Sequence, residues 1–412
     1  MRKEEKGITL VALIITIVVM LILVAVSINI LVNSNLIGHA EKTGEAYAGA
    51  IKNEEKLGND GITINDKEYA SIDDYIESRK PLPEGAGKKF TETKEYTDGT
   101  KTAVIPGGFT VSGIRKETTI DEGLVIYLIP DDEIENVKWD GTEKTKYDQF
   151  VWIPVTNVNK MFMCQAKTES DSGCDLKIEG NEVICQTHKT ADATKSKKMA
   201  GRLYATSLGG NINSSLTTQT YNANDGLREP AIITGNSKGT GKQYDGSNTD
   251  NNIGLKLSTL QEEYNNAVKK VIESKGFWIG RYETSGMSSS NSNDSTTILS
   301  VVAGKGTSDG ISKVNWYRMY KQQQNYANKK ELDTSKIQST MVFGAAWEQI
   351  MLFANCATAT TPGKSYLEVI TGNVETDCYK NIYDLCGNLR EWTTEADDTI
   401  SRVYRGRQFQ QQ

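Results

Sequence analysis

The sequence predicts an α+β protein in which a long apolar N-terminal helix precedes a loop-rich region of short strands and two to three helices. Three observations carry this prediction. Residues 8–32 form an apolar run without a charged side chain. Short segments rich in β-branched and aromatic residues, bounded by Gly, Pro, Asn and Asp, recur after residue 90. Three further stretches place apolar residues at helical spacing. The length of 412 residues suggests two or three structural units.

The N-terminal run is long enough to cross a membrane. A helix rises about 1.5 Å per residue, so residues 8–32 can span a hydrocarbon core of about 30 Å. Three of the first seven residues are basic, which predicts that the N-terminus stays cytoplasmic and that the rest of the chain lies outside. A polar continuation extends the predicted helix to about residue 57, where Gly58-Asn59-Asp60-Gly61 ends it.

Lys6 and Gly7 stand directly before the apolar run, and this segment resembles the class III signal of type IV prepilins. In that family a membrane peptidase cuts after the glycine. The resemblance therefore implies a prepilin peptidase as a partner and cleavage between Gly7 and Ile8. Ala12 stands where the family usually has Glu, which implies a minor or simply membrane-anchored subunit, with other pilin subunits as further partners. A plain signal anchor is the alternative.

The elements that follow divide the remaining chain. Residues 62–64 are strand-like, and Ser71-Ile72-Asp73-Asp74 predicts a capped short helix through about Ser78. Prolines and glycines between residues 81 and 87 indicate a linker. The predicted organisation is a leader over 1–7, a helix over 8–57, a spacer and linker over 58–90, and a last domain over 91–412.

Within the last domain, local patterns predict individual elements. The predicted strands cover residues 103–105, 124–129, 150–155 and 277–282. The predicted helices cover residues 258–274, 316–327 and 345–356, and the first of them opens with the capping-box pattern Ser258-Thr259-Leu260-Gln261. Polar stretches over 207–252 and 286–299 cannot bury enough apolar surface to order themselves, so exposed loops are predicted there.

Five ordered segments resemble the sulfatase-modifying-factor family, also called formylglycine-generating-enzyme-like domains. They begin at Gly276, Val314, Gly344, Asn381 and Arg402, and the strongest is Asn381-Ile382-Tyr383-Asp384-Leu385-Cys386-Gly387-Asn388-Leu389-Arg390-Glu391-Trp392-Thr393. The resemblance implies a C-type-lectin-like fold of small antiparallel sheets, two helices and many loops. It also implies that Trp316, Trp347 and Trp392 supply buried area to this domain.

The same resemblance bears on whether the protein is an enzyme or a ligand-binding protein. Catalytic members use a pair of cysteines near the C-terminus, and here no Cys follows Cys386, so a formylglycine-generating oxidase is disfavoured. Variable proteins of diversity-generating retroelements share this fold, with ligand-contacting residues just after the motif that corresponds to Arg405-Gly406. The resemblance thus implies that Arg407, Gln408, Phe409 and Gln410 begin a ligand-binding face. A frayed polar tail is the alternative.

The six cysteines leave three interpretations open. If all pair as disulfides, 15 connectivities are allowed. Free buried thiols are the second interpretation. The third is zinc bound by Cys164, Cys174, Cys185 and His188, although only Cys185 and His188 have a short ligand spacing. Calcium bound through Asn388 and Glu391 is a further alternative that rests on the lectin-like fold. No resident metal or cofactor is predicted.

The charge balance argues against one class of binding partner. Lys and Arg total 47, Asp and Glu total 53, and the formal net charge is −6, which argues against a nucleic-acid partner. The sequence contains only two histidines, which argues against a catalytic mechanism that needs a histidine base. We therefore predict a pilin-anchored, extracellular ligand-binding protein that is not an enzyme and whose surface ligand is unknown. A structural minor pilin or pseudopilin is the alternative.

Overall fold

The computed structural model describes residues 62–64, 67–166, 173–201, 204–206, 212–216, 229–230, 257–286, 299–305, 316–355, 370–373, 378–385, 391–396 and 402–405. Two compact units divide the chain, Met1–Pro81 and Leu82–Gln412. The boundary falls inside the segment 58–90 in which the sequence predicts a spacer and linker.

The first unit contains a small hairpin and a capped helix. Strands β1 (Ile62–Ile64) and β2 (Lys67–Tyr69) pair antiparallel. Helix α3 (Ile72–Arg79) follows, and the Ser71 hydroxyl accepts a hydrogen bond from the Asp74 backbone N–H at 3.1 Å. This bond satisfies one of the N–H groups that a helix start leaves without a partner, as the capping-box pattern predicts.

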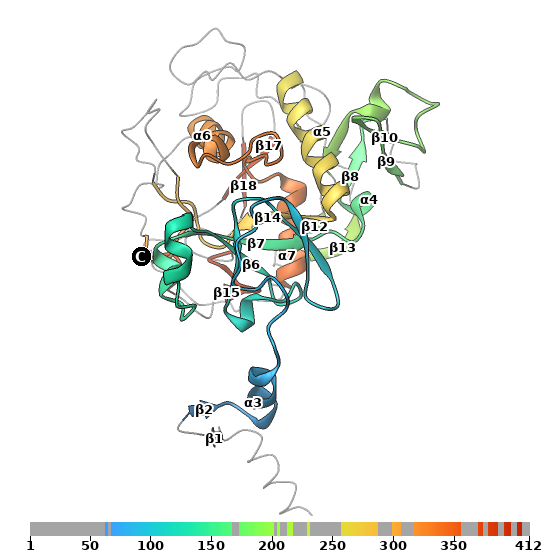
Figure 1. Ribbon diagram of the computed structural model, residues 1–412. Coiled ribbons are helices and arrows are strands. Elements are labelled where there is room, and N and C mark those ends of the chain that lie inside the picture. The colour runs from blue at the N-terminus through green and yellow to red at the C-terminus, as the bar shows by residue number, and fades with distance from the viewer. Residues whose placement is uncertain are drawn as a thin grey trace, which may run out of the picture. The chain divides into compact units, whose positions relative to one another are not determined.

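The second unit is built around a four-stranded antiparallel sheet in the order β14-β7-β6-β5. Figure 1 labels three of these strands, β14, β7 and β6. Its strands are β5 (Thr110–Val111), β6 (Val125–Leu128), β7 (Asp148–Pro154) and β14 (Gly276–Gly280). The aromatic and β-branched run Phe150-Val151-Trp152-Ile153 makes β7 a central strand, because both of its faces are covered.

Successive residues of β7 point to opposite faces of the sheet and pack into two different cores. Val151 and Ile153 pack with Trp347 and Ile350 of helix α7 (Gly344–Ala354) on one face of the sheet. Trp152 points to the other face, where it packs with Tyr96 and other residues of the hairpin β3 (Lys94–Thr97) and β4 (Thr102–Ile105). Successive strand residues face opposite sides of a sheet, so one strand contributes to both cores.

Helix α5 (Leu257–Ser274) covers a third core formed by short strand pairs. Ser258, predicted as its cap, lies inside the helix, and the Gln261 side chain donates to the Met199 carbonyl instead. The remaining elements are α4 (Val158–Met161), β8 (Phe162–Cys164), β9 (Leu176–Glu179), β10 (Glu182–Cys185), β11 (Met199–Gly201), β12 (Tyr204–Thr206), β13 (Ile212–Leu216), α6 (Trp316–Lys329), β15 (Cys378–Tyr379), β16 (Ile382–Tyr383), β17 (Glu391–Ala396) and β18 (Arg402–Arg405).

The predicted fold class needs one correction. The α+β character and the small antiparallel sheets are present, but no helix in the described part of the chain is both long and apolar enough to cross a membrane. Helix α5 has 18 residues, of which five carry a charged side chain: Glu262, Glu263, Lys269, Lys270 and Glu273. Its polar side therefore lies on the domain surface. The transmembrane helix is therefore not supported. Residues 8–57, on which it was predicted, lie outside the described residues.

Candidate metal centre

Three thiols and one imidazole meet beside helix α5. Cys164 is the last residue of β8, Cys174 precedes β9, Cys185 ends β10, and His188 lies in the turn that follows. All four are buried, with exposed fractions of 0% for Cys164 and Cys185, 7% for Cys174 and 5% for His188. Figure 1 shows β9 and β10 beside α5, which contacts both strands.

Local pairing brings these residues together. The β9–β10 hairpin turns at Gly180, whose φ of +61° suits glycine, and its register places Cys185 opposite Leu176. The Gln186 N–H donates to the Asp175 carbonyl at 2.8 Å, which extends the hairpin and keeps Cys174 close to Cys185. The fourth residue, Cys164, is positioned by a second pair of strands, β8 and β11, in which it lies opposite Met199.

Helix α5 holds the β8–β11 strand pair through hydrogen bonds with the side-chain amides of Gln261 and Asn265. The Met199 N–H donates to Asn265 Oδ1 at 3.0 Å, and the Met199 carbonyl accepts from Gln261 Nε2 at 2.9 Å. Gln165 Nε2 donates to Gln261 Oε1 at 2.7 Å. These bonds satisfy the backbone of a short edge strand and fix its position relative to the helix.

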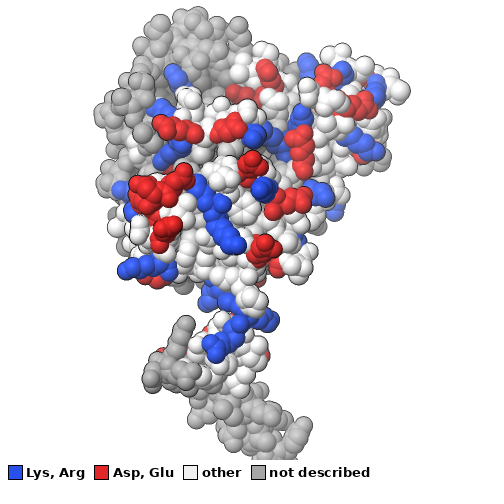
Figure 2. Space-filling view, viewed as in Figure 1, with Lys and Arg blue, Asp and Glu red and all other residues white. Residues whose placement is uncertain are grey.

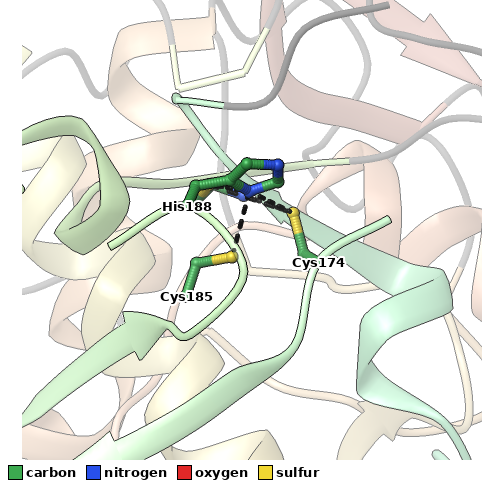
Figure 3. Close-up of side chains that lie close together, drawn as sticks. Cys174, Cys185 and His188 are labelled. Carbon is green, nitrogen blue, oxygen red and sulfur yellow. Dashed lines mark hydrogen bonds between the residues drawn. The ribbon is translucent and has the colours of Figure 1, made fainter. Parts of the chain in front are cut away.

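The ligand atoms of the four residues converge on one point. They lie within 4.8 Å of one another. The Nδ1 atom of His188 is 3.2 Å from the sulfur of Cys164, 3.2 Å from that of Cys185 and 3.8 Å from that of Cys174. The Cys164 and Cys174 sulfurs are 3.9 Å apart. Figure 3 shows the Cys174 and Cys185 sulfurs directed at the same imidazole nitrogen.

Hydrogen bonding alone does not account for this convergence. A ring nitrogen of neutral imidazole is either one donor or one acceptor, yet three sulfurs surround His188 Nδ1. A Zn²⁺ ion about 2.3 Å from sulfur and about 2.0 Å from nitrogen places its tetrahedral ligands roughly 3.5–3.8 Å apart. Four of the six spacings, 3.2, 3.2, 3.8 and 3.9 Å, are close to the edges of that tetrahedron, and the other two are no longer than 4.8 Å.

The four side chains of the cluster lie in apolar surroundings. The centre is enclosed by apolar side chains of one core cluster, including Met161, Phe162, Leu176 and Val183. Contact with the Cys174 thiol, together with burial, raises the pKa of the Cys164 thiol far above its usual value. The Cys164 thiol therefore stays protonated without a nearby cation, whereas a bound metal ion takes its cysteine ligands as thiolates.

A separate cavity of about 1060 Å³ lies in the same unit between the sheet and the helices. Aromatic side chains from several elements line it, among them Phe109, Phe150, Trp278, Tyr326 and Trp347. Gln323 of α6 also lines it, and donates to Thr284 Oγ1 at 3.3 Å. A largely apolar cavity with a few polar groups is the usual form of a small-molecule site.

Most of the other predicted site residues lie outside the part of the chain that the structure describes. Gly7 and Ile8, the predicted processing site, lie outside the described residues, as do Arg407, Gln408, Phe409 and Gln410. Of the two calcium candidates, Glu391 is half-buried on β17, and Asn388 lies outside the described part. Cys378, half-buried on β15, is not one of the four clustered residues.

Spacing was a weak signal for this metal centre. The short Cys185-x-x-His188 pair indicated two ligands, but the longer gaps to Cys164 and Cys174 are unlike the paired cysteines of common zinc modules. Only strand pairing closes those gaps. Comparison with known protein families, curated proteins and solved structures finds no match to this chain.

Proposed function

We propose that this protein is a zinc protein in which Cys164, Cys174, Cys185 and His188 hold one structural Zn²⁺ ion. The observation that carries the proposal is the convergence of three sulfurs on His188 Nδ1 at 3.2–3.8 Å in a buried pocket. Four protein ligands complete the tetrahedral coordination of zinc and leave no position for a reacting water. That arrangement is typical of structural rather than catalytic zinc.

Soft thiolate ligands with one imidazole favour zinc over the hard cations calcium and magnesium, which prefer oxygen. The zinc would join three pieces of chain: β8, the segment before β9, and the end of the β9–β10 hairpin. Its role is then to stabilise a part of the domain made of very short strands, which bury little surface by themselves.

Metal analysis tests this proposal. The purified full chain should contain one zinc per chain, and Cys174→Ser and His188→Ala should each lower the zinc affinity by roughly 100-fold or more, since even outer-shell changes cost 10–100-fold. Cys378→Ser is the matched control, because it removes a thiol outside the cluster and should retain the metal. If a variant folds poorly, Co²⁺ replacement of zinc in the unaltered chain gives a second readout, the visible absorption of tetrahedral cobalt–thiolate. A chain purified without zinc that also fails to bind Co²⁺ refutes the proposal.

We propose ligand binding as a second function, supported by the aromatic cavity of about 1060 Å³. This volume is near the upper end of the range usual for small-molecule sites. Quenching of tryptophan fluorescence by an apolar dye such as 1-anilinonaphthalene-8-sulfonate tests it, because Trp152, Trp278 and Trp347 line the cavity. Saturable binding at one site is expected, and Ala346→Trp, which would fill part of the cavity, should weaken it. Dye binding unchanged by that variant argues against this function. Display at the cell surface and assembly with pilin subunits stay predictions.

A further inference from the structure

We propose that the metal centre responds to oxidation, and that its specific product is a disulfide between Cys164 and Cys174 formed as the metal leaves. This inference rests on the proposed zinc site and adds a form of regulation to it. The two sulfurs are already 3.9 Å apart, and the Cys164 backbone N–H donates to the Cys174 sulfur at 3.4 Å. A disulfide needs about 2.05 Å between sulfurs, so a combined movement of roughly 2 Å suffices.

The environment of Cys174 favours it over Cys185 as the thiol that is oxidised first. Cys185 is fixed at the end of β10, where it is paired in register with Leu176 and is fully buried. Cys174 precedes β9 and lies outside any strand, and its exposed fraction of 7% exceeds the 0% of the other two. A small oxidant therefore reaches Cys174 first, and Cys174 can shift without breaking a strand pair.

The proposed oxidant is a peroxide. The Cys174 thiolate attacks one peroxide oxygen, the O–O bond breaks, and Cys174 becomes a sulfenic acid. The Cys164 thiolate then attacks the Cys174 sulfur and displaces hydroxide, which forms the S–S bond. Two electrons pass from the two sulfurs to hydrogen peroxide, which takes up two protons and leaves as two water molecules. Zinc loses two of its four ligands and dissociates.

The oxidised centre keeps one of the connections that zinc provided. The disulfide still joins the end of β8 to the segment before β9, whereas Cys185 and His188 are released from the shared ion. A dithiol reductant reverses the reaction by returning two electrons and regenerating both thiols. The consequence is a reversible change that loosens the β9–β10 hairpin relative to β8 without unfolding the central sheet.

Peroxide titration of the zinc-loaded full chain tests this inference. Zinc release is followed with a chromogenic chelator, and peptide mapping identifies the cross-link. We expect zinc release to parallel formation of the Cys164–Cys174 disulfide, and dithiothreitol with added zinc to restore the starting state. Cys174→Ser should abolish the cross-link, and Cys378→Ser should leave both release and cross-link unchanged.

The outcomes distinguish this inference from the proposed function. A chain that holds zinc but keeps it under peroxide overturns the oxidation response alone. Release accompanied by a cross-link to Cys185, or by sulfinic acids without a cross-link, also overturns it. A chain that holds no zinc before any peroxide is added overturns the zinc site and this inference together.

Discussion

At the scale of single residues, Arg281 illustrates how a charge is accommodated in the core. It follows β14 and is buried, with its Nη1 2.6 Å from Glu117 Oε1. Gln149 Oε1 accepts from the same Nη1 at 3.0 Å, and the Tyr127 hydroxyl donates to Glu117 Oε2 at 2.7 Å. A buried ion pair is better tolerated when its remaining hydrogen-bonding groups are satisfied. This network supplies partners for Arg281 Nη1 and for the Glu117 carboxylate, whereas the buried Arg281 Nε has no hydrogen-bond partner among the described residues.

Removing the arginine should therefore be costly. We expect Arg281→Met to lower the free energy of unfolding by about 3–5 kcal/mol, because Glu117 would stay buried without its cation. Urea unfolding measures the change, and adding Glu117→Gln should recover part of the loss. Lys101→Met is the control, since the Lys101–Asp121 pair is exposed and should contribute at most about 1 kcal/mol. Equal effects at the two sites would contradict the buried network.

At the scale of elements, turns and helix contacts join the small sheets. Gly123 precedes β6 with a φ of +92°, and a Cβ placed there would lie 2.0 Å from the Lys380 carbonyl oxygen in the turn between β15 and β16. The Asn381 side chain donates to the Gly123 carbonyl at 2.7 Å in the same contact. Two hairpins far apart in sequence thus touch at a point where only glycine fits.

This contact predicts that alanine substitution destabilises the protein more at Gly123 than at Gly99. Gly123→Ala should destabilise the protein by about 3 kcal/mol, because it combines an unfavourable φ with a backbone collision. Gly99→Ala is a close control, since Gly99 has a φ of +95° but nothing within 4 Å of the added methyl group. It should cost only about 1 kcal/mol. Thermal or urea unfolding of both variants compares the two, and similar losses would rule out the collision.

The contact between α5 and α6 predicts a pH dependence. Glu263 Oε2 accepts hydrogen bonds from the Tyr320 hydroxyl and from Gln324, and burial, followed by repulsion from Glu262, raises the Glu263 pKa to about 7. Between an unfolded pKa of about 4.3 and the raised value, the folded state binds more protons, so stability falls as pH rises through this window.

Glu263→Gln should remove that dependence. We expect the difference in unfolding free energy between the variant and the unaltered chain to shift in favour of the variant as pH rises from about 4.5 to 7, and then to level off. Urea midpoints at several pH values, with zinc held in excess, provide the measurement. A difference that does not change across this window would show that Glu263 titrates normally.

At the scale of the whole molecule, the chain divides into two compact units, Met1–Pro81 and Leu82–Gln412. The clusters that form the central core, the metal centre and the cavity all belong to Leu82–Gln412. On the face drawn in Figure 2, acidic and basic side chains are interspersed over the described surface rather than gathered by sign. Such a distribution of charge indicates no strongly directional electrostatic field on that face.

The second unit should therefore fold by itself. We expect the fragment Leu82–Gln412 to keep one zinc and the urea midpoint of the full chain, because none of the residues described in the first unit, 62–64 and 67–81, belongs to these clusters. Stripping zinc with a chelator should lower its melting temperature by roughly 10 °C, since a ligand at 1,000 times its dissociation constant contributes about 4 kcal/mol. A fragment that loses zinc or unfolds at lower urea would contradict this independence.

Local sequence patterns determined several elements of this protein. The predicted helices over 258–274 and 345–356 correspond to α5 and α7, and the aromatic strand over 150–155 corresponds to β7. Each helix is specified by apolar residues at helical spacing, and the strand by a run of aromatic and β-branched residues. The Ser71 cap was predictable for the same reason, since its partner Asp74 is three residues away.

The proposed metal centre depends on tertiary structure. The sequence specified thiols and an imidazole, which are soft ligands, but only Cys185 and His188 are close enough along the chain to indicate a shared ion. Cys174 is brought to them by the β9–β10 hairpin, and Cys164 by the pairing of β8 with β11, which α5 holds through Gln261 and Asn265. Strand register and helix packing are long-range choices that side-chain spacing does not encode, so a coordination geometry built from them emerges only when the chain folds.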